Sequence, residues 1–320
     1  MSTIVQQHLI QDADSRWAAF RSHVGVTREK LERSAPSTCL YALVDTRGLP
    51  DLRSALERLD SIVFASLWDG SDLSAFGDIA PLLIRIDLGA TGSDVPHQLL
   101  NRLWRFADDG FMVTWIWSPF ALDQVADHFR AYCEYTLPDR RTFYLHFYDN
   151  RILERLRLTW APEEWARFAG VAYEMWCCNG GGVERIWSTD APRLFEDTTA
   201  PGLNTEQHLA LLASGIPDKL AMQLREICGS FIDHLSPREL REAVRIQVER
   251  AARYRVQCEG DLLMYAKKGL LISPRFDEHP LIQPQLELAS YGDVSYFDVL
   301  SQLDDAFRES FALHRARERE

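Results

Sequence analysis

TFYLHFYDNRIL, residues 142–153, is the segment from which the expected fold follows. In its first half, large apolar side chains alternate with a period of two, which is typical of a β-strand. The alternation ends at Asp149, whose carboxylate can accept hydrogen bonds from the free N–H groups of a first helical turn. Beyond it, Ile152, Leu153 and Leu156 recur at helical spacing. The segment therefore predicts a strand that leads through a capped turn into a helix.

Short apolar runs alternate with helical patterns on both sides of this segment. We expect further strands at residues 39–44, 62–67, 82–86 and 111–117, with helices between most of them. This alternation predicts an α/β domain whose largely parallel sheet is flanked by helices. Two later runs, Val171–Cys177 and Val183–Trp187, are expected to form an antiparallel hairpin at the edge of the sheet.

Changes in composition divide the chain into four expected parts. Residues 1–38 are an N-terminal helix and lead-in, residues 39–189 the α/β domain, and residues 190–203 a linker. The linker lies in the stretch Ser188–Asn204, where the composition changes to Ser, Thr, Asp, Pro and Gly. The strand pattern then ceases, and residues 204–320 are expected to form a smaller all-helical domain. Its clearest helix start is Ser236-Pro237-Arg238-Glu239, which has capping-box spacing with proline at the first helical position.

Composition and charge limit the classes of partner. The 320 residues are 46% hydrophobic and 26% charged, as in ordinary globular domains, and the net charge of -12 disfavours nucleic acid. The longest apolar stretch without charge, Gly110–Leu122, is shorter than the roughly 20 residues that a membrane helix needs. No signal-peptide pattern opens the chain, and the six cysteines are scattered. We expect a cytoplasmic protein that does not bind a membrane.

Familiar catalytic motifs are missing from the sequence. It contains no Gly-x-Ser-x-Gly elbow, no phosphate loop ending in Gly-Lys-Ser/Thr, and no His-Glu-x-x-His zinc helix. Their absence agrees with the expectation of a protein that is not an enzyme, with no catalytic residue, no cofactor and no bound metal, which the family resemblance described below implies.

Four aspartates that follow expected strands keep an enzymatic alternative open. Asp45, Asp69, Asp87 and Asp149 would meet at one edge of a parallel sheet, where α/β proteins bind ligands. There they could serve a metal- or nucleotide-dependent hydrolase. That alternative predicts Asp45, Asp87 and Asp149 around a concave pocket, whereas the simpler interpretation is that each aspartate caps a helix or turn.

Tryptophan is abundant, with nine residues in the chain. Trp115 and Trp117 share one face of an expected strand and Ile116 occupies the other. If helices cover both faces of the sheet, these tryptophans belong to the core; otherwise they are candidate anchors for a protein partner.

Six short motifs follow one another in a specific order. They are Leu40–Asp45, Leu67–Gly70, Pro81–Arg85, the strand within Gly110–Ser118, Leu137–Arg140 and Phe147–Leu153. The ordered set resembles the N-terminal domain of the type VI secretion adaptors, also called effector chaperones, over roughly Cys39–Cys178. Residues 251–254, 259–269, 276–277 and Pro280 are similar to the second half often joined to that domain. The family usually carries Arg where His146 stands and Pro where Asn150 stands.

The resemblance implies a non-catalytic cytoplasmic adaptor of a Gram-negative bacterium. Such a protein binds a secreted effector, in our interpretation through the effector's N-terminal region, and assists its loading onto the VgrG spike. An immunity protein that neutralises one toxin is a further alternative, although such proteins are typically smaller single domains. The family-motif residues either hold the fold or contact a partner; they are Asp45, Asp69, Arg85, Tyr148, Asp149 and Arg151.

Overall fold

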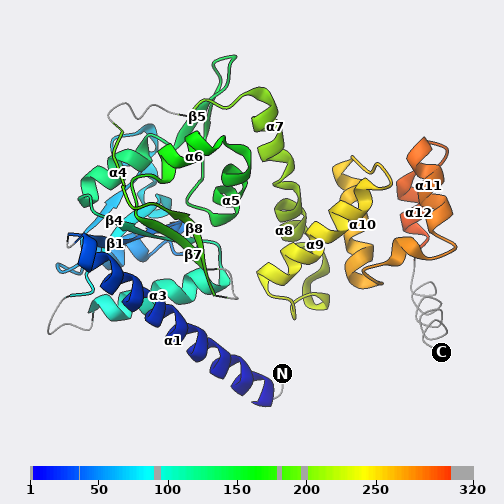
Figure 1. The fold of residues 1–320 in the computed structure, drawn as a ribbon. Coiled ribbons are helices and arrows are strands. Elements are labelled where there is room, and N and C mark those ends of the chain that lie inside the picture. The colour runs from blue at the N-terminus through cyan, green and yellow to red at the C-terminus, as the bar shows by residue number, and fades with distance from the viewer. Residues whose placement is uncertain (1–2, 36, 90–94, 179–181, 196–200, 304–320) are drawn as a thin grey trace. The chain divides into compact units, whose positions relative to one another are not determined.

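The chain folds as two compact units, Met1–Leu212 and Ala213–Glu320. The computed structural model describes residues 3–35, 37–89, 95–178, 182–195 and 201–303 (Figure 1). No helix in these ranges is both long and apolar enough to cross a membrane.

A six-stranded sheet forms the centre of the first unit, in the order β2-β3-β1-β4-β7-β8. Each neighbouring pair is antiparallel, so the expectation of a largely parallel sheet is wrong. The β7–β8 pair at the edge confirms the expected antiparallel hairpin. The strands are β1 Cys39–Val44, β2 Phe64–Ser66, β3 Leu82–Ile86, β4 Val113–Ser118, β7 Glu174–Cys178 and β8 Val183–Ser188.

Burial on both faces explains why the strand direction was misjudged. Uninterrupted apolar runs are typical of parallel strands because helices cover both sides of parallel sheets. Here helices cover both sides of an antiparallel sheet, which places the same demand on the sequence. The reversal matters for the site: Val44, at the end of β1, lies opposite Leu82, at the start of β3. Residues that follow β1 and residues that follow β3 therefore lie at opposite ends of the strands.

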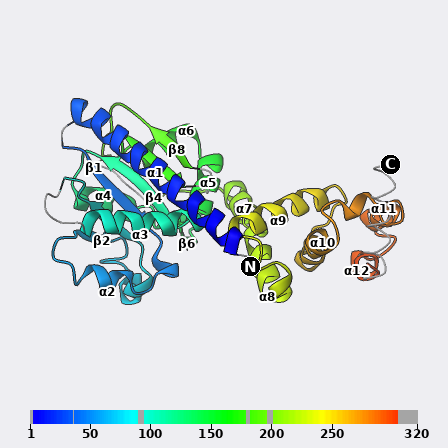
Figure 2. The ribbon, with the colours of Figure 1, turned by 90° about the horizontal axis from the view of Figure 1, so that it is seen from below.

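Two helical layers sandwich this sheet (Figures 1 and 2). One layer buries Phe20 of α1 and Trp104 of α3 against Trp115 and Trp117 of β4, with α2 at its margin. The other layer, of α4, α5 and α6, packs against the face that includes Ile116. Both β4 tryptophans are therefore core residues. The helices are α1 Thr3–Ser34, α2 Leu52–Leu56, α3 Val95–Asp109, α4 Leu122–Arg130, α5 Asn150–Thr159, α6 Pro162–Ala169 and α7 Thr205–Ala213.

The segment at residues 142–153 confirms the expected cap and helix, with a shorter strand. Its strand, β6 Thr142–Tyr144, pairs with β5 Glu134–Thr136 in a separate two-stranded sheet. The N–H of Leu145 still donates to the carbonyl of Cys133, and Phe147 and Tyr148 beyond it are buried in the core. Asp149 then caps α5 by accepting a hydrogen bond from the backbone N–H of Arg151.

In the second unit, all the regular elements within the described residues are helices. The capping box at Ser236 forms as expected: its side chain accepts from the N–H of Glu239, whose carboxylate accepts from the N–H of Ser236. A buried ion pair between Arg250 and Asp277 joins α9 to the 3-10 helix η4. The elements are α8 Ile216–Cys228, η3 Gly229–Phe231, α9 Pro237–Ala252, α10 Glu259–Leu271, η4 Phe276–Glu278, α11 Gln283–Tyr291 and α12 Tyr296–Ser301.

Candidate functional site

Two turns of the same construction meet beside the sheet. Asp45 follows β1 and caps the 3-10 helix η1, Thr46–Gly48, as Asp149 caps α5. In each turn the arginine two residues on folds back onto its own aspartate: the Nε of Arg47 lies 2.9 Å from Oδ1 of Asp45, and the Nε of Arg151 2.9 Å from Oδ1 of Asp149. Arg47 also reaches Oδ2 of Asp149 at 3.3 Å, which links the two turns. We call Asp45, Arg47, Asp149 and Arg151 the double Asp-x-Arg turn.

Charge in the double Asp-x-Arg turn is balanced within a buried setting. The side chain of Asp45 is fully buried and that of Asp149 is 4% exposed. Burial alone would raise the pKa of Asp149, but hydrogen bonds and charge from Arg151, together with the charge of Arg47, outweigh it and lower that pKa. Hydrogen bonding to Asp45 is the main cause that raises the pKa of Arg47. The carboxylate of Asp149 is thus ionised, and both aspartates accept hydrogen bonds from guanidinium groups.

Tyr148 and His146 extend this cluster with uncharged groups. Burial raises the pKa of Tyr148, and burial followed by the charge of Arg47 lowers the pKa of His146. Both are therefore neutral near pH 7, and the Tyr148 hydroxyl shares a hydrogen bond with Nδ1 of His146. The guanidinium carbon of Arg47 lies 5.9 Å from the centroid of the Tyr148 ring. The Tyr148 ring thus packs against Arg47 of the double Asp-x-Arg turn.

Asn150 fastens the turn to the central sheet. Its Oδ1 accepts from the Thr114 hydroxyl at 2.6 Å, and its Nδ2 donates to the Val113 carbonyl at 2.9 Å. Its backbone N–H donates to the carbonyl of Phe111 at 2.7 Å, a bond that proline could not make. Sequence analysis did not single out Asn150 or Arg47 for these roles, although the repeated Asp-x-Arg spacing was a visible signal for Arg47.

The structure assembles only part of the family-motif set. Asp45, Tyr148, Asp149 and Arg151 come together in or beside the double Asp-x-Arg turn. Asp69 is half exposed and lies 3.9 Å from the guanidinium of Arg53. Arg85 is exposed on β3, opposite Tyr41 of β1.

The four aspartates do not form the cluster that the hydrolase alternative predicts. Asp87 follows β3, at the end of the strands opposite to the end where Asp45 lies. Its Oδ1 accepts a hydrogen bond from the N–H of Gly89. Asp45 and Asp149 are bridged by Arg47. Within the described residues, no group of three or more His, Cys, Asp or Glu side chains is placed to hold a metal ion. The predicted geometry of that alternative is therefore wrong.

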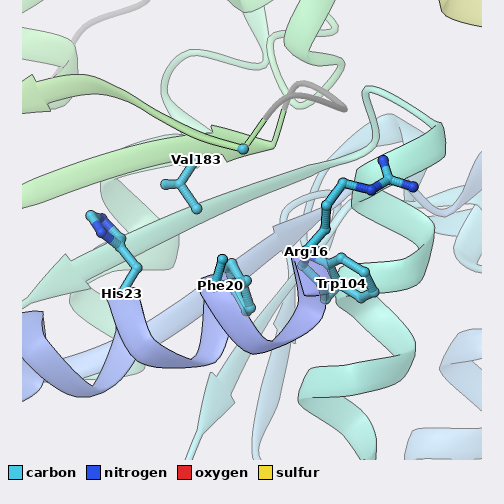
Figure 3. Close-up of a pocket in the computed structure, with 7 residues that line it drawn as sticks. Arg16, Phe20, His23, Trp104 and Val183 are labelled. Carbon is cyan, nitrogen blue, oxygen red and sulfur yellow. The ribbon is translucent and has the colours of Figure 1, made fainter. Parts of the chain in front are cut away.

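A cavity of about 250 Å³ lies in the helical layer that contains α1 and α3. Figure 3 shows Arg16, Phe20 and His23 on successive turns of α1, with Val183 of β8 facing them and Trp104 of α3 beside Phe20. Sequence analysis did not predict this cavity, because it joins residues more than 160 positions apart.

Apolar side chains are exposed on the last helices of the second unit. Leu288 and Tyr291 of α11 are 47% and 75% exposed, and Phe297 of α12 is 58% exposed. Leu288 and Tyr291, three residues apart, share the face of α11 that points away from its buried residues Leu286 and Ala289. Leu281 and Val294, which flank α11 in the sequence, are also exposed. We call Leu281, Leu288, Tyr291, Val294 and Phe297 the apolar patch.

Comparison with known families identifies one domain in the chain. Residues 40–167, less than half of the chain, match the family described as a domain of unknown function, DUF4123. This is the domain associated with type VI secretion effector chaperones, in agreement with the resemblance of the motifs. The chain matches no curated protein and no solved structure.

Proposed function

We propose that this protein is a cytoplasmic type VI secretion adaptor of a Gram-negative bacterium. It binds a cognate effector, assists the loading of that effector onto the VgrG spike, and catalyses no reaction. The DUF4123 match supports the link to this secretion system.

The apolar patch is the observation that carries the proposal. A large side chain such as Tyr291 that is 75% exposed contributes little to folding, and neighbouring exposed apolar groups mark surfaces that bind other proteins. The net charge of -12 keeps such a surface soluble between binding events. A chaperone needs this combination, because it must cover the apolar surface of its cargo and release it again.

The double Asp-x-Arg turn supports the non-catalytic part of the proposal. A catalytic carboxylate needs room for substrate and a proton to exchange, whereas Asp45 and Asp149 accept hydrogen bonds from Arg47 and Arg151 in a closed arrangement. In our proposal this cluster stabilises the fold of the first unit.

Affinity purification from the native cell tests the proposal. The tagged full-length chain is expected to recover a spike protein and a toxin, both identified by mass spectrometry. Tyr291→Asp combined with Phe297→Asp should lose one of them, while Gln285→Asp, an exposed polar position on the same helix, should retain both. Circular dichroism checks that each variant is folded. Recovery of neither partner by the unaltered chain refutes the adaptor, and recovery of the toxin alone favours an immunity protein.

A further inference from the structure

Exposed carboxylates accompany the apolar patch. Residues 281–301, which contain the whole patch, include Glu287, Asp293 and Asp298 but no lysine or arginine. All three acidic side chains belong to exposed residues. Glu287 accepts a hydrogen bond from the uncharged Gln283 at 3.1 Å, and none of the three forms an ion pair within the described residues. This segment therefore carries negative charge that its own residues do not neutralise.

The carboxylates and the apolar side chains lie on two helices joined by a short turn. α11 ends at Gly292, whose φ of 86° lies in the left-handed region that favours glycine, and α12 packs against α11 beyond it. Six positions separate Tyr291 from Phe297, so both exposed rings lie close to this turn. Glu287 precedes Tyr291 by one helical turn on the same face of α11, and Asp298 adjoins Phe297. Negative charge thus borders the exposed rings.

One cation reaches the apolar patch from outside this segment. The guanidinium carbon of Arg255 lies 5.7 Å from the centroid of the Tyr291 ring. Tyr291 is still 75% exposed, so the arginine orients the ring without covering it. The patch therefore combines an oriented, accessible aromatic ring with three carboxylates and one guanidinium.

The sign of this charge distinguishes between possible occupants. Membrane surfaces carry anionic lipids, and the apolar faces that bind them are flanked by lysine and arginine, which residues 281–301 lack. A second copy of the chain would bring like charges opposite one another. A partner polypeptide whose apolar side chains are flanked by lysine or arginine would cover the exposed rings and pair with the carboxylates.

We infer that the apolar patch binds a cationic amphipathic segment of a partner polypeptide, in which large apolar side chains are flanked by lysine or arginine. The inference rests on the proposed function, in which the chain binds other polypeptides, and it adds the chemistry of the partner. The apolar side chains of the segment pack on Tyr291 and Phe297. Its cations face the three carboxylates.

Fluorescence anisotropy with defined peptides tests this chemistry on the full-length chain. The probe is fluorescein-labelled GSKLFKKLFKGS. It is compared with GSELFEELFEGS, which reverses the charge, and with GSKAAKKAAKGS, which lacks the large apolar side chains. Loss of the apolar side chains should weaken binding about thirtyfold, the loss typical of an anchor residue. Reversal of the charge should weaken binding about tenfold, and added salt should reduce that difference.

Substitutions of exposed aromatic residues place the binding on the apolar patch. Tyr291→Ser combined with Phe297→Ser should weaken binding of the probe about tenfold or more. Phe231→Ser removes an aromatic ring that is 68% exposed on η3, outside the patch, and should leave binding within about twofold. Circular dichroism checks that each variant is folded.

A second pair of variants tests the role of the carboxylates. Asp293→Asn combined with Asp298→Asn should weaken binding of the probe about fivefold and make it less dependent on salt. Glu226→Gln combined with Asp233→Asn makes the same change in charge at exposed positions outside the patch, and should leave binding within about twofold.

Several results would overturn the inference. They are no binding of the probe up to millimolar concentration, equal binding of the acidic peptide, and equal losses in the patch variant and in Phe231→Ser. Self-association that Tyr291→Ser with Phe297→Ser removes would make a second copy the occupant, and binding to anionic phospholipid vesicles that this variant loses would make it a membrane. Recovery of spike and toxin by the unaltered chain is a separate result, so failure of this inference is distinguishable from failure of the adaptor function.

Discussion

Replacing Asp149 tests whether its ionised carboxylate holds the double Asp-x-Arg turn. In Asp149→Ala the first turn of α5 loses its cap, which costs about 1 kcal/mol. The variant also loses charge-assisted hydrogen bonds from Arg151, which contribute about 1.5–3 kcal/mol. The side chain of Arg151 is 24% exposed and can regain water, so we expect a total loss of about 2–4 kcal/mol. Asp149→Asn keeps an acceptor for the cap and should lose about half as much.

The pH dependence of the same variants gives a second, independent signature. The pKa of Asp149 is lowered from 3.8 in the folded state, so the unfolded chain binds its proton more tightly. Stabilisation by this carboxylate is therefore complete above the unfolded pKa and is lost as the pH falls through the lower folded pKa. Between about pH 5 and pH 2 the unaltered chain should lose more stability than Asp149→Asn.

Urea unfolding followed by tryptophan fluorescence measures both effects. All nine tryptophans lie between residues 17 and 187, so the signal reports the first unit and is silent on the second. A free energy of unfolding for Asp149→Ala within about 0.5 kcal/mol of the unaltered chain, the range of neutral surface changes, would refute the reasoning. Parallel pH profiles for the unaltered chain and Asp149→Asn would refute the assigned charge state.

Three further outcomes are expected. Asn150→Ala, which removes two buried side-chain hydrogen bonds to β4, should lower the stability of the first unit by about 2 kcal/mol in the same urea assay. Arg250→Met leaves the buried carboxylate of Asp277 without its cation and should destabilise the second unit by about 3–5 kcal/mol, measured by far-ultraviolet circular dichroism. Burial raises the pKa of Cys133 to about 12, so iodoacetamide at pH 8 should modify the exposed Cys258 and leave Cys133 intact until urea is added, as read by peptide mass spectrometry.

Local features of the fold were predictable from the sequence and the strand direction was not. The Asp149 cap and the helix after it depend on residues adjacent in the chain, and they form as expected. Strand direction depends on which strands become neighbours. Apolar strands such as β1, buried on both faces, carry the same pattern in parallel and antiparallel sheets.

In the candidate site, too, local contacts were predictable from the sequence and long-range contacts were not. The pairing of Arg151 with Asp149 is local and was within reach of sequence analysis. The bridge from Arg47 to Asp149 spans 102 positions, and the bonds of Asn150 to β4 span nearly 40, so both depend on the tertiary fold. The expectation that Asp87 lies beside Asp45 and Asp149 was wrong because the strand direction was wrong.

The account depends most on the claim that this chain binds other polypeptides and delivers one to another. Size-exclusion chromatography with light scattering, on the purified chain mixed with a recovered toxin and then with the spike, measures this directly. We predict that the chain and toxin elute together and that the toxin then joins the spike only when the chain is present. Separate elution of all three at micromolar concentration, or equal joining of toxin and spike without the chain, would contradict the account.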